Sequence, residues 1–173
     1  MLLVTKESRP RNTASVKEWC QAMEITYHPI GILHSPFSDL KEMPIQPTGG
    51  ASSPGTAEVL PEFTSGLKDL EGFSHVILLY HLHKVRRVDL TVTPFLGSES
   101  RGVFATRAPT RPNPIGLSIV ELVRIEGNCL YLGNIDILDG TPLLDIKPYV
   151  PEFDQPVDAK TGWIEGSCEK INA

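Results

Sequence analysis

The sequence has few cysteines and no long apolar run. Its three cysteines, Cys20, Cys129 and Cys168, are far apart and odd in number, and no Cys-x-x-Cys pair occurs. This pattern favours free thiols in the reducing cytoplasm over a disulfide framework. No stretch reaches the roughly 18 consecutive apolar residues that a membrane helix requires. We therefore expect a cytoplasmic protein with no membrane span.

The motifs of the common nucleotide-binding and hydrolase folds are also missing. No Gly-x-Gly-x-x-Gly follows a strand-like segment, and neither a P-loop nor a Gly-x-Ser-x-Gly elbow occurs. A doubly wound Rossmann domain is therefore not expected. The net charge of −5 argues against a general polyanion binder. Residues 84–124, however, contain seven basic and three acidic residues, a local charge of +4 that indicates an anion or nucleic-acid site.

The 173 residues predict one mainly-β domain. Fifteen prolines and 14 glycines suit short strands joined by turns, and a single helical turn is expected around Leu67 and Leu70 before Gly72. Because closure removes exposed sheet edges, we expect a single compact β-barrel over residues 25–154. An extension with one short helix (16–23) would occupy residues 1–24, and a tail residues 155–173. The predicted strands are 25–37, 56–60, 73–83 (buried on both faces), 88–95, 102–106, 117–125, 129–137 and 143–154, with a long loop at 38–55.

The segment RAPTRPNPIGLSIVEL, residues 107–122, combines a stiff loop with cations. Pro112 and Pro114 fix their own φ and keep the residues before them out of the helical region. Arg107 and Arg111 supply forked donors that suit carboxylate or phosphate, and Asn113 suits the edge of a base. A solvated proline-rich connector and a pre-ordered binding loop explain this pattern equally well.

Three histidines lie on the apolar segment 73–83. His75, His81 and His83 are all odd-numbered, so a regular strand would point them to one face. His81-x-His83 is a spacing that some zinc sites use, but no motif supplies a third ligand. Histidines satisfied by hydrogen bonds are favoured over a metal site, with one of them lining a ligand pocket.

Two aspartates in the segment LDGTPLLDIKPY differ in context. Asp139–Gly140 is a strong tight-turn signal. Asp145 interrupts an apolar strand, where an unpaired carboxylate would be costly, so it requires a partner such as an internal cation or a ligand.

Four stretches in order resemble the TsaA-like, or TrmO-type, family of tRNA methyltransferases. They are IGILHSPF (30–37), LKDLEGFSHVILLYHLH (67–83), GVFATRAPTRPNPIGLSIVEL (102–122) and DGTPLLDIKPYVP (139–151). The resemblance implies a compact β-barrel that binds S-adenosylmethionine without a Rossmann fold, usually as a homodimer. It implies methylation of the exocyclic nitrogen of threonylcarbamoyl-adenosine, next to the anticodon of tRNA.

The resemblance also implies where the site residues lie. A carboxylate could take the proton from the substrate nitrogen, with Asp139 and Asp145 both candidates, and Tyr149 could orient the substrate. The arginine-rich segment would contact RNA through Arg86, Arg87, Arg101, Arg111 and Asn113. Cofactor-binding residues would be Pro44, Ile45, Gln46, His83, Lys84, Arg107, Leu117, Leu138, Asp139, Gly140 and Thr141, with no metal.

Longer bacterial members of the family carry a further C-terminal domain, whereas only a short tail follows Pro151 here. Binding of tRNA would then rely on the basic segment, doubled across a dimer, and should weaken steeply with salt. A non-catalytic barrel that binds S-adenosylmethionine or an adenosine-like ligand is an alternative, and a His-metal hydrolase is a weaker one.

Overall fold

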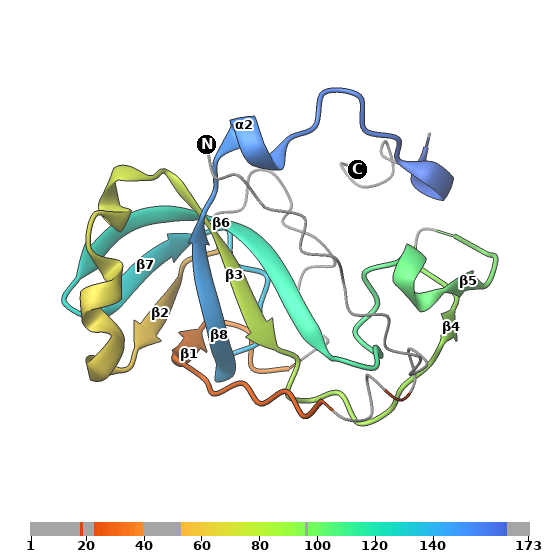
Figure 1. The fold of residues 1–173 in the computed structure, drawn as a ribbon, viewed down its shortest axis with the longest axis horizontal. Coiled ribbons are helices and arrows are strands. Elements are labelled where there is room, and N and C mark those ends of the chain that lie inside the picture. Colours follow the sequence, from red (N-terminus) through yellow and green to blue (C-terminus); the bar gives the residue numbers. More distant parts are fainter. Residues whose placement is uncertain (1–17, 19–22, 40–52, 96, 166–173) are drawn as a thin grey trace.

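Six antiparallel strands close into a barrel. The computed structural model describes Glu18 and residues 23–39, 53–95 and 97–165. The strands follow one another around the barrel in the order β1-β2-β7-β6-β3-β8 (Figure 1). This architecture confirms the predicted mainly-β barrel. The strands are β1 (Gly31–His34), β2 (Gly55–Val59), β3 (His75–His81), β6 (Ile115–Glu126), β7 (Cys129–Gly133) and β8 (Thr141–Pro148).

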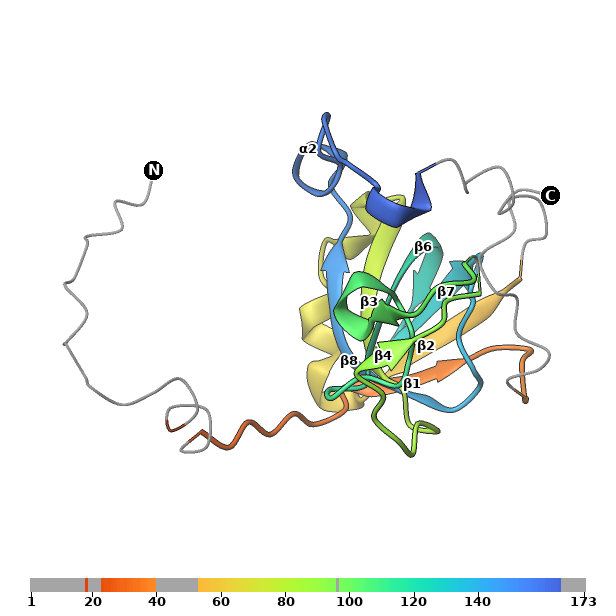
Figure 2. The ribbon, with the colours of Figure 1, turned by 90° about the vertical axis from the view of Figure 1, so that its right-hand side faces the viewer.

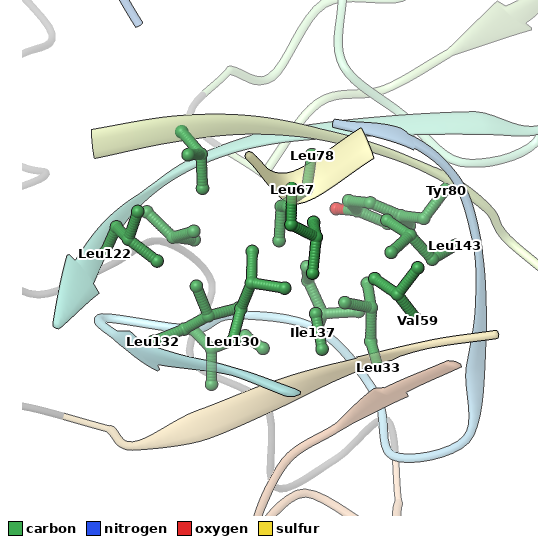
Figure 3. Packing of buried hydrophobic residues seen from close by; sticks show 14 residues of the cluster. Leu33, Val59, Leu67, Leu78, Tyr80, Leu122, Leu130, Leu132, Ile137 and Leu143 are labelled. Atoms are coloured by element: carbon green, nitrogen blue, oxygen red, sulfur yellow. The ribbon is translucent and has the colours of Figure 1, made fainter. Parts of the chain in front are cut away.

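The core of the barrel is made by alternate residues of its strands. On β3, Val76, Leu78 and Tyr80 are buried, while the odd-numbered residues between them are only partly covered. The prediction that this strand is buried on both faces was therefore wrong, because one side of a barrel strand faces outward. Figure 3 shows the inward side chains meeting in one cluster. Its labelled members are Leu33, Val59, Leu67, Leu78, Tyr80, Leu122, Leu130, Leu132, Ile137 and Leu143.

Residues 84–113 form a separate small unit, which we call the arginine lobe. It contains β4 (Thr91–Val92), β5 (Arg101–Gly102) and the 3₁₀ turn η3 (Val103–Ala105). The two strands pair only with each other, so the lobe stands beside the barrel (Figures 1 and 2). We expected longer strands at 88–95 and 102–106 within the barrel. That prediction was wrong because Pro94 has no N–H with which to continue the pairing of β4, and Val103–Ala105 turn into η3.

The two ends of the barrel are built differently. The 3₁₀ turns η1 (Pro61–Leu67) and η2 (Leu70–Gly72) cover one end, which we call the capped end. A single helical turn was predicted around Leu67 and Leu70 before Gly72, and these two short segments are found there. Leu67 points from η1 into the core (Figure 3). A cavity of about 540 Å³ lies beneath these turns. We call the opposite end, where β1 and β3 finish and β8 begins, the mouth.

Three predicted strands are clearly shorter than expected. The strand predicted at 25–37 is limited to β1, the one at 129–137 ends at Gly133, and the one at 143–154 ends at Pro148. Beyond it, α2 (Pro151–Asp154) is a single helical turn that begins with a proline, and η4 (Gly162–Ile164) follows. The helix expected at 16–23 lies almost wholly outside the described residues. In the described part of the chain, no helix has the length and apolarity needed to cross a membrane.

Candidate functional site

The Asp139–Gly140 turn is tied to the end of β1 at the mouth. Gly140 has a φ of +72°, a left-handed conformation that glycine adopts without strain. The Asp139 amide donates to the Phe37 carbonyl oxygen at 2.8 Å. The Asp139 carboxylate accepts from the Ser35 amide at 3.1 Å and lies 3.4 Å from His34 Nδ1. The turn is therefore more than a hairpin, because its half-exposed carboxylate is held in place by a neighbouring strand.

His83 lies just after β3 and meets the start of β8. The strand ends at His81, and a turn brings His83 Nδ1 to 3.5 Å from the Thr141 hydroxyl oxygen. The prediction of one common face therefore fails for His83. The buried Thr141 hydroxyl also donates to the Leu138 carbonyl oxygen at 2.7 Å. Burial, helped by the positive charges of Lys84, His81 and Arg86, lowers the pKa of His83, so a neutral imidazole at neutral pH stands beside this turn.

The stiff loop between the lobe and β6 reaches the same end. The Leu82 amide donates to the Pro114 carbonyl oxygen at 2.8 Å, which joins this loop to the end of β3. The Arg107 side chain is exposed on this loop. Four of the residues that the family resemblance implies for the cofactor, His83, Arg107, Asp139 and Thr141, thus come from three distant segments of the chain.

Arg111 is engaged within its own loop. Its Nη1 group donates to the carbonyl oxygens of Val103, Thr106 and Ala108 at 3.4, 2.9 and 3.3 Å. A guanidinium with these partners fixes the loop and has less freedom to contact RNA. Asn113 and the remaining basic residues assigned to RNA or cofactor are at least partly exposed, namely Lys84, Arg86, Arg87 and Arg101.

A buried polar chain near the mouth was missed by the sequence analysis. The Ser118 hydroxyl donates to the Asp136 carboxylate at 2.7 Å, so the Tyr80 hydroxyl must donate to Ser118, 3.0 Å away. The Tyr80 oxygen is visible among the apolar side chains of Figure 3. Burial raises the pKa of Tyr80. Gly116 makes room for the ring, because a Cβ there would overlap Tyr80.

A sequence signal for this chain existed. Tyr80 and Ser118 occupy inward positions of otherwise apolar strands, and Asp136 interrupts the apolar NIDIL segment. Because polar groups at core positions require partners, the alternation along the two strands could have indicated that Tyr80 and Ser118 face each other inside the barrel, whereas Asp136 lies outside any strand.

Asp145 and Tyr149 are not brought to the mouth. They lie toward the capped end of β8, where Asp145 lines the cavity and Tyr149 packs edge-on against His75 at 6.3 Å. Asp145 pairs with Lys147 at 2.8 Å, so a cation is its partner, but both side chains are about half-exposed and the carboxylate is not buried as the apolar strand suggested. Leu117 lies on the outer face of β6 and is 48% exposed, unlike the buried Thr141. Pro44, Ile45 and Gln46 lie outside the described residues.

The described residues offer no ready metal site. Nowhere in that part of the chain do three histidine, cysteine or carboxylate side chains come together as metal ligands. His81 is exposed at the end of β3, whereas His83 turns toward Thr141. The geometry thus gives no support to the metal hydrolase alternative.

The fold and the mouth define a small closed barrel with a polar site at one end. Residues 32–155 match the family model of the tRNA-methyltransferase O N-terminal domain, and the chain belongs to this family. It is 56% identical to a probable S-adenosyl-L-methionine-binding protein of Pyrococcus abyssi over 85% of this chain and 80% of that protein. It is 38% identical to the human tRNA (adenine(37)-N6)-methyltransferase over 87% of this chain but only 37% of the human one.

Solved structures show the same fold. The crystal structure of TrmO from Pseudomonas aeruginosa superposes with a TM-score of 0.68 at 42% identity. The superposition covers 82% of this chain and 63% of that one. The chain therefore corresponds to somewhat less than two thirds of this structural relative.

Proposed function

We propose that this chain is a methyltransferase that uses S-adenosylmethionine to modify tRNA. The observation that carries the proposal is the contact, at the barrel mouth, between His83 and the Asp139–Thr141 turn, with the stiff loop that follows Arg107 joined to the end of β3 beside them. The names of the relatives agree with it, since they describe S-adenosylmethionine binding or tRNA adenine methylation.

The side chains at the mouth suit this cofactor chemically. Arg107 and Lys84 are exposed cations that would pair with the cofactor carboxylate. The half-exposed Asp139 carboxylate suits the sulfonium centre or a ribose hydroxyl, and neutral His83 adds no further positive charge. Leu138 is apolar and adjoins the Asp139 turn, so it would cover the adenine, whereas Leu117 faces outward from β6.

When bound, the cofactor supplies an electrophilic methyl group. The contribution of the chain would be to align an attacking nitrogen with it, since orientation removes much of the entropic barrier. Of the two candidate carboxylates, Asp139 lies among the converging residues and Asp145 does not. We assign Asp139 as the group that accepts the proton from the nitrogen. The substrate would be the exocyclic nitrogen of threonylcarbamoyl-adenosine next to the anticodon.

The arginine lobe would hold the tRNA. It carries six basic and two acidic residues, a net charge of +4, although the whole chain is at −5. Phosphate contacts from such a surface supply affinity that falls with salt. A tRNA substrate would place the activity in the cytoplasm.

A homodimer would bury an apolar outer face of the barrel. In an antiparallel sheet facing water, outward positions are usually polar. Here β3 and β6 place Ile77 opposite Ile119 and Leu79 opposite Leu117, all directed outward, with Ile115 at the end of the row. A contiguous apolar patch of this kind marks an interface. Because Leu117 is part of it, pairing two copies would bring this leucine next to the partner's surface.

The dimer is tested by measuring mass in solution with light scattering. Leu117→Glu should yield a monomer, whereas Ile32→Glu, at a similarly exposed position on β1, should leave the mass unchanged. A monomeric parent chain would contradict the dimer.

A binding protein that transfers no methyl group is the second candidate, because the relative from Pyrococcus abyssi is named only for its binding. Labelled S-adenosylmethionine offered with tRNA that carries threonylcarbamoyl-adenosine separates the two functions. Label on this tRNA, and not on tRNA without the modification, supports the methyltransferase. Cofactor binding by calorimetry without label on either tRNA supports the binding protein. Arg107→Ala should reduce transfer far more than it reduces the melting temperature.

A further inference from the structure

The arginine lobe exposes an aromatic ring at its surface. Phe104 lies in the middle of η3 and is 76% exposed, while its neighbour Val103 is 1% exposed and anchors the turn. A three-residue turn held in this way keeps the ring outward. A single exposed phenylalanine is common on protein surfaces and proves little alone. The groups around Phe104 are what distinguish it.

One of those groups is a fixed cation. The Arg111 guanidinium carbon lies over the Phe104 ring, 5.9 Å from its centroid. The same guanidinium is held by the three carbonyl oxygens of its own loop. The Thr106 hydroxyl braces this loop further by donating to the Val103 carbonyl oxygen at 2.9 Å. The ring is therefore backed by an ordered cation while most of its surface stays open to solvent.

The surrounding charge favours an anionic partner. Within the lobe, Arg87 pairs with Asp89 at 2.9 Å and Arg101 with Glu99 at 2.6 Å. The net charge of +4 thus resides in the four remaining basic residues of the lobe, which are Lys84, Arg86, Arg107 and Arg111. Open aromatic rings among cations are the arrangement by which proteins bind unpaired nucleotides, with bases on the rings and phosphates on the cations.

We propose that Phe104 is a stacking platform for one unpaired base of the RNA that is methylated at the mouth. This inference rests on the proposed function and names how its substrate is positioned. The ring is preordered, so little conformational entropy is lost when a base stacks on it. Stacking is tolerant of base identity because every base has an aromatic face. Phe104 would therefore contribute affinity and placement rather than sequence selection.

The test uses the full chain and an RNA hairpin with the sequence of a tRNA anticodon stem-loop. The Phe104→Ala variant should bind this hairpin about tenfold more weakly, as expected for the loss of one stacked base. The slope of affinity against salt should stay unchanged, because a stacked base releases no counterions. Phe104→Trp should restore binding. Phe153→Ala is the matched control, because Phe153 is also strongly exposed (83%) but lies on α2 outside the lobe.

A second readout locates the stacked base. Hairpins that carry 2-aminopurine at one loop position at a time should show one position whose fluorescence is quenched by the parent and not by Phe104→Ala. The melting temperature and the cofactor affinity of this variant should equal those of the parent. A loss of either would overturn the proposal, because the ring would then act on the fold.

The failure of this inference differs from the failure of the proposed function. If Phe104→Ala binds the hairpin as tightly as the parent while the parent methylates tRNA, the stacking platform is wrong and the methyltransferase stands. If the parent chain binds no hairpin and transfers no methyl group, both proposals are overturned.

Discussion

The mouth and the capped end of the barrel differ in the neighbours of their aspartates. At the mouth, Asp139 is held by Ser35 and His34 from another strand. Toward the capped end, Asp145 pairs with Lys147, its near neighbour on the same strand. Both aspartates belong to one short motif, but Asp139 lies in the turn before β8, and Asp145 lies four residues along the strand from Thr141, about 13 Å of extended chain. One short motif thus places an aspartate at the mouth and another toward the capped end. Only at the mouth do side chains from distant segments come together around it.

The sharpest test of this difference exchanges each carboxylate for an amide. Asp139→Asn should lower the rate of methyl transfer about a hundredfold, as expected for the loss of a proton acceptor. Asp145→Asn should stay within about twofold, since its partner is structural. Initial rates at saturating cofactor and tRNA measure both. Equal losses in the two variants would contradict the assignment of roles to the two ends.

Replacing a glycine by alanine should destabilise the fold near the mouth and leave it unchanged at the capped end. Gly116→Ala would push a methyl group into the Tyr80 ring, which is buried and cannot yield freely. We expect a loss of about 2 kcal/mol or more in the free energy of unfolding. Gly66→Ala, in η1 at the capped end, is the control because no atom lies within 4 Å of the added carbon. Denaturant titration measures both, and an unchanged Gly116→Ala midpoint would refute the close packing.

Acid should weaken the fold through His83. Because burial lowers its pKa below the usual value of 6.5, the unfolded chain takes up a proton that the folded chain resists. Stability is therefore unaffected above this value and falls as the pH drops through 6.5 and below. His83→Gln should lose less melting temperature between pH 7.5 and 5.5 than the parent does. His28→Gln, exposed before β1, should behave like the parent, and identical pH profiles for all three chains would contradict the prediction.

The smallest effect is expected toward the capped end. Asp145 and Lys147 are side-chain partners that remain half-exposed, at 44% and 57%. Such pairs contribute about 0–1 kcal/mol to stability. Lys147→Met should therefore shift the thermal midpoint only slightly. A large shift would mean that the pair holds the cavity beneath η1 and η2 in shape.

Local signals predicted much of the fold. Apolar runs and turn residues located all six barrel strands, three of them (β2, β3 and β6) within two residues at each end, and the helical turn before Gly72 was placed correctly. The arginine lobe was misread because Val88–Phe95 alternates like a strand but finds no partner in the barrel. The alternation of apolar and polar residues shows which side chains a strand could bury. It does not show whether a partner strand is available.

Composition and motifs were enough to predict a mainly-β chain, a concentration of basic residues in 84–124, and membership of the TrmO-type family. They could not predict which aspartate lies with His83 at the mouth, that Arg111 is held by its own loop, or that Tyr80, Ser118 and Asp136 form a hydrogen-bonded chain. The physical reason is that barrel closure sets side chains against neighbours far away in sequence. Those contacts depend on register and on the ends of strands, which short-range patterns do not encode.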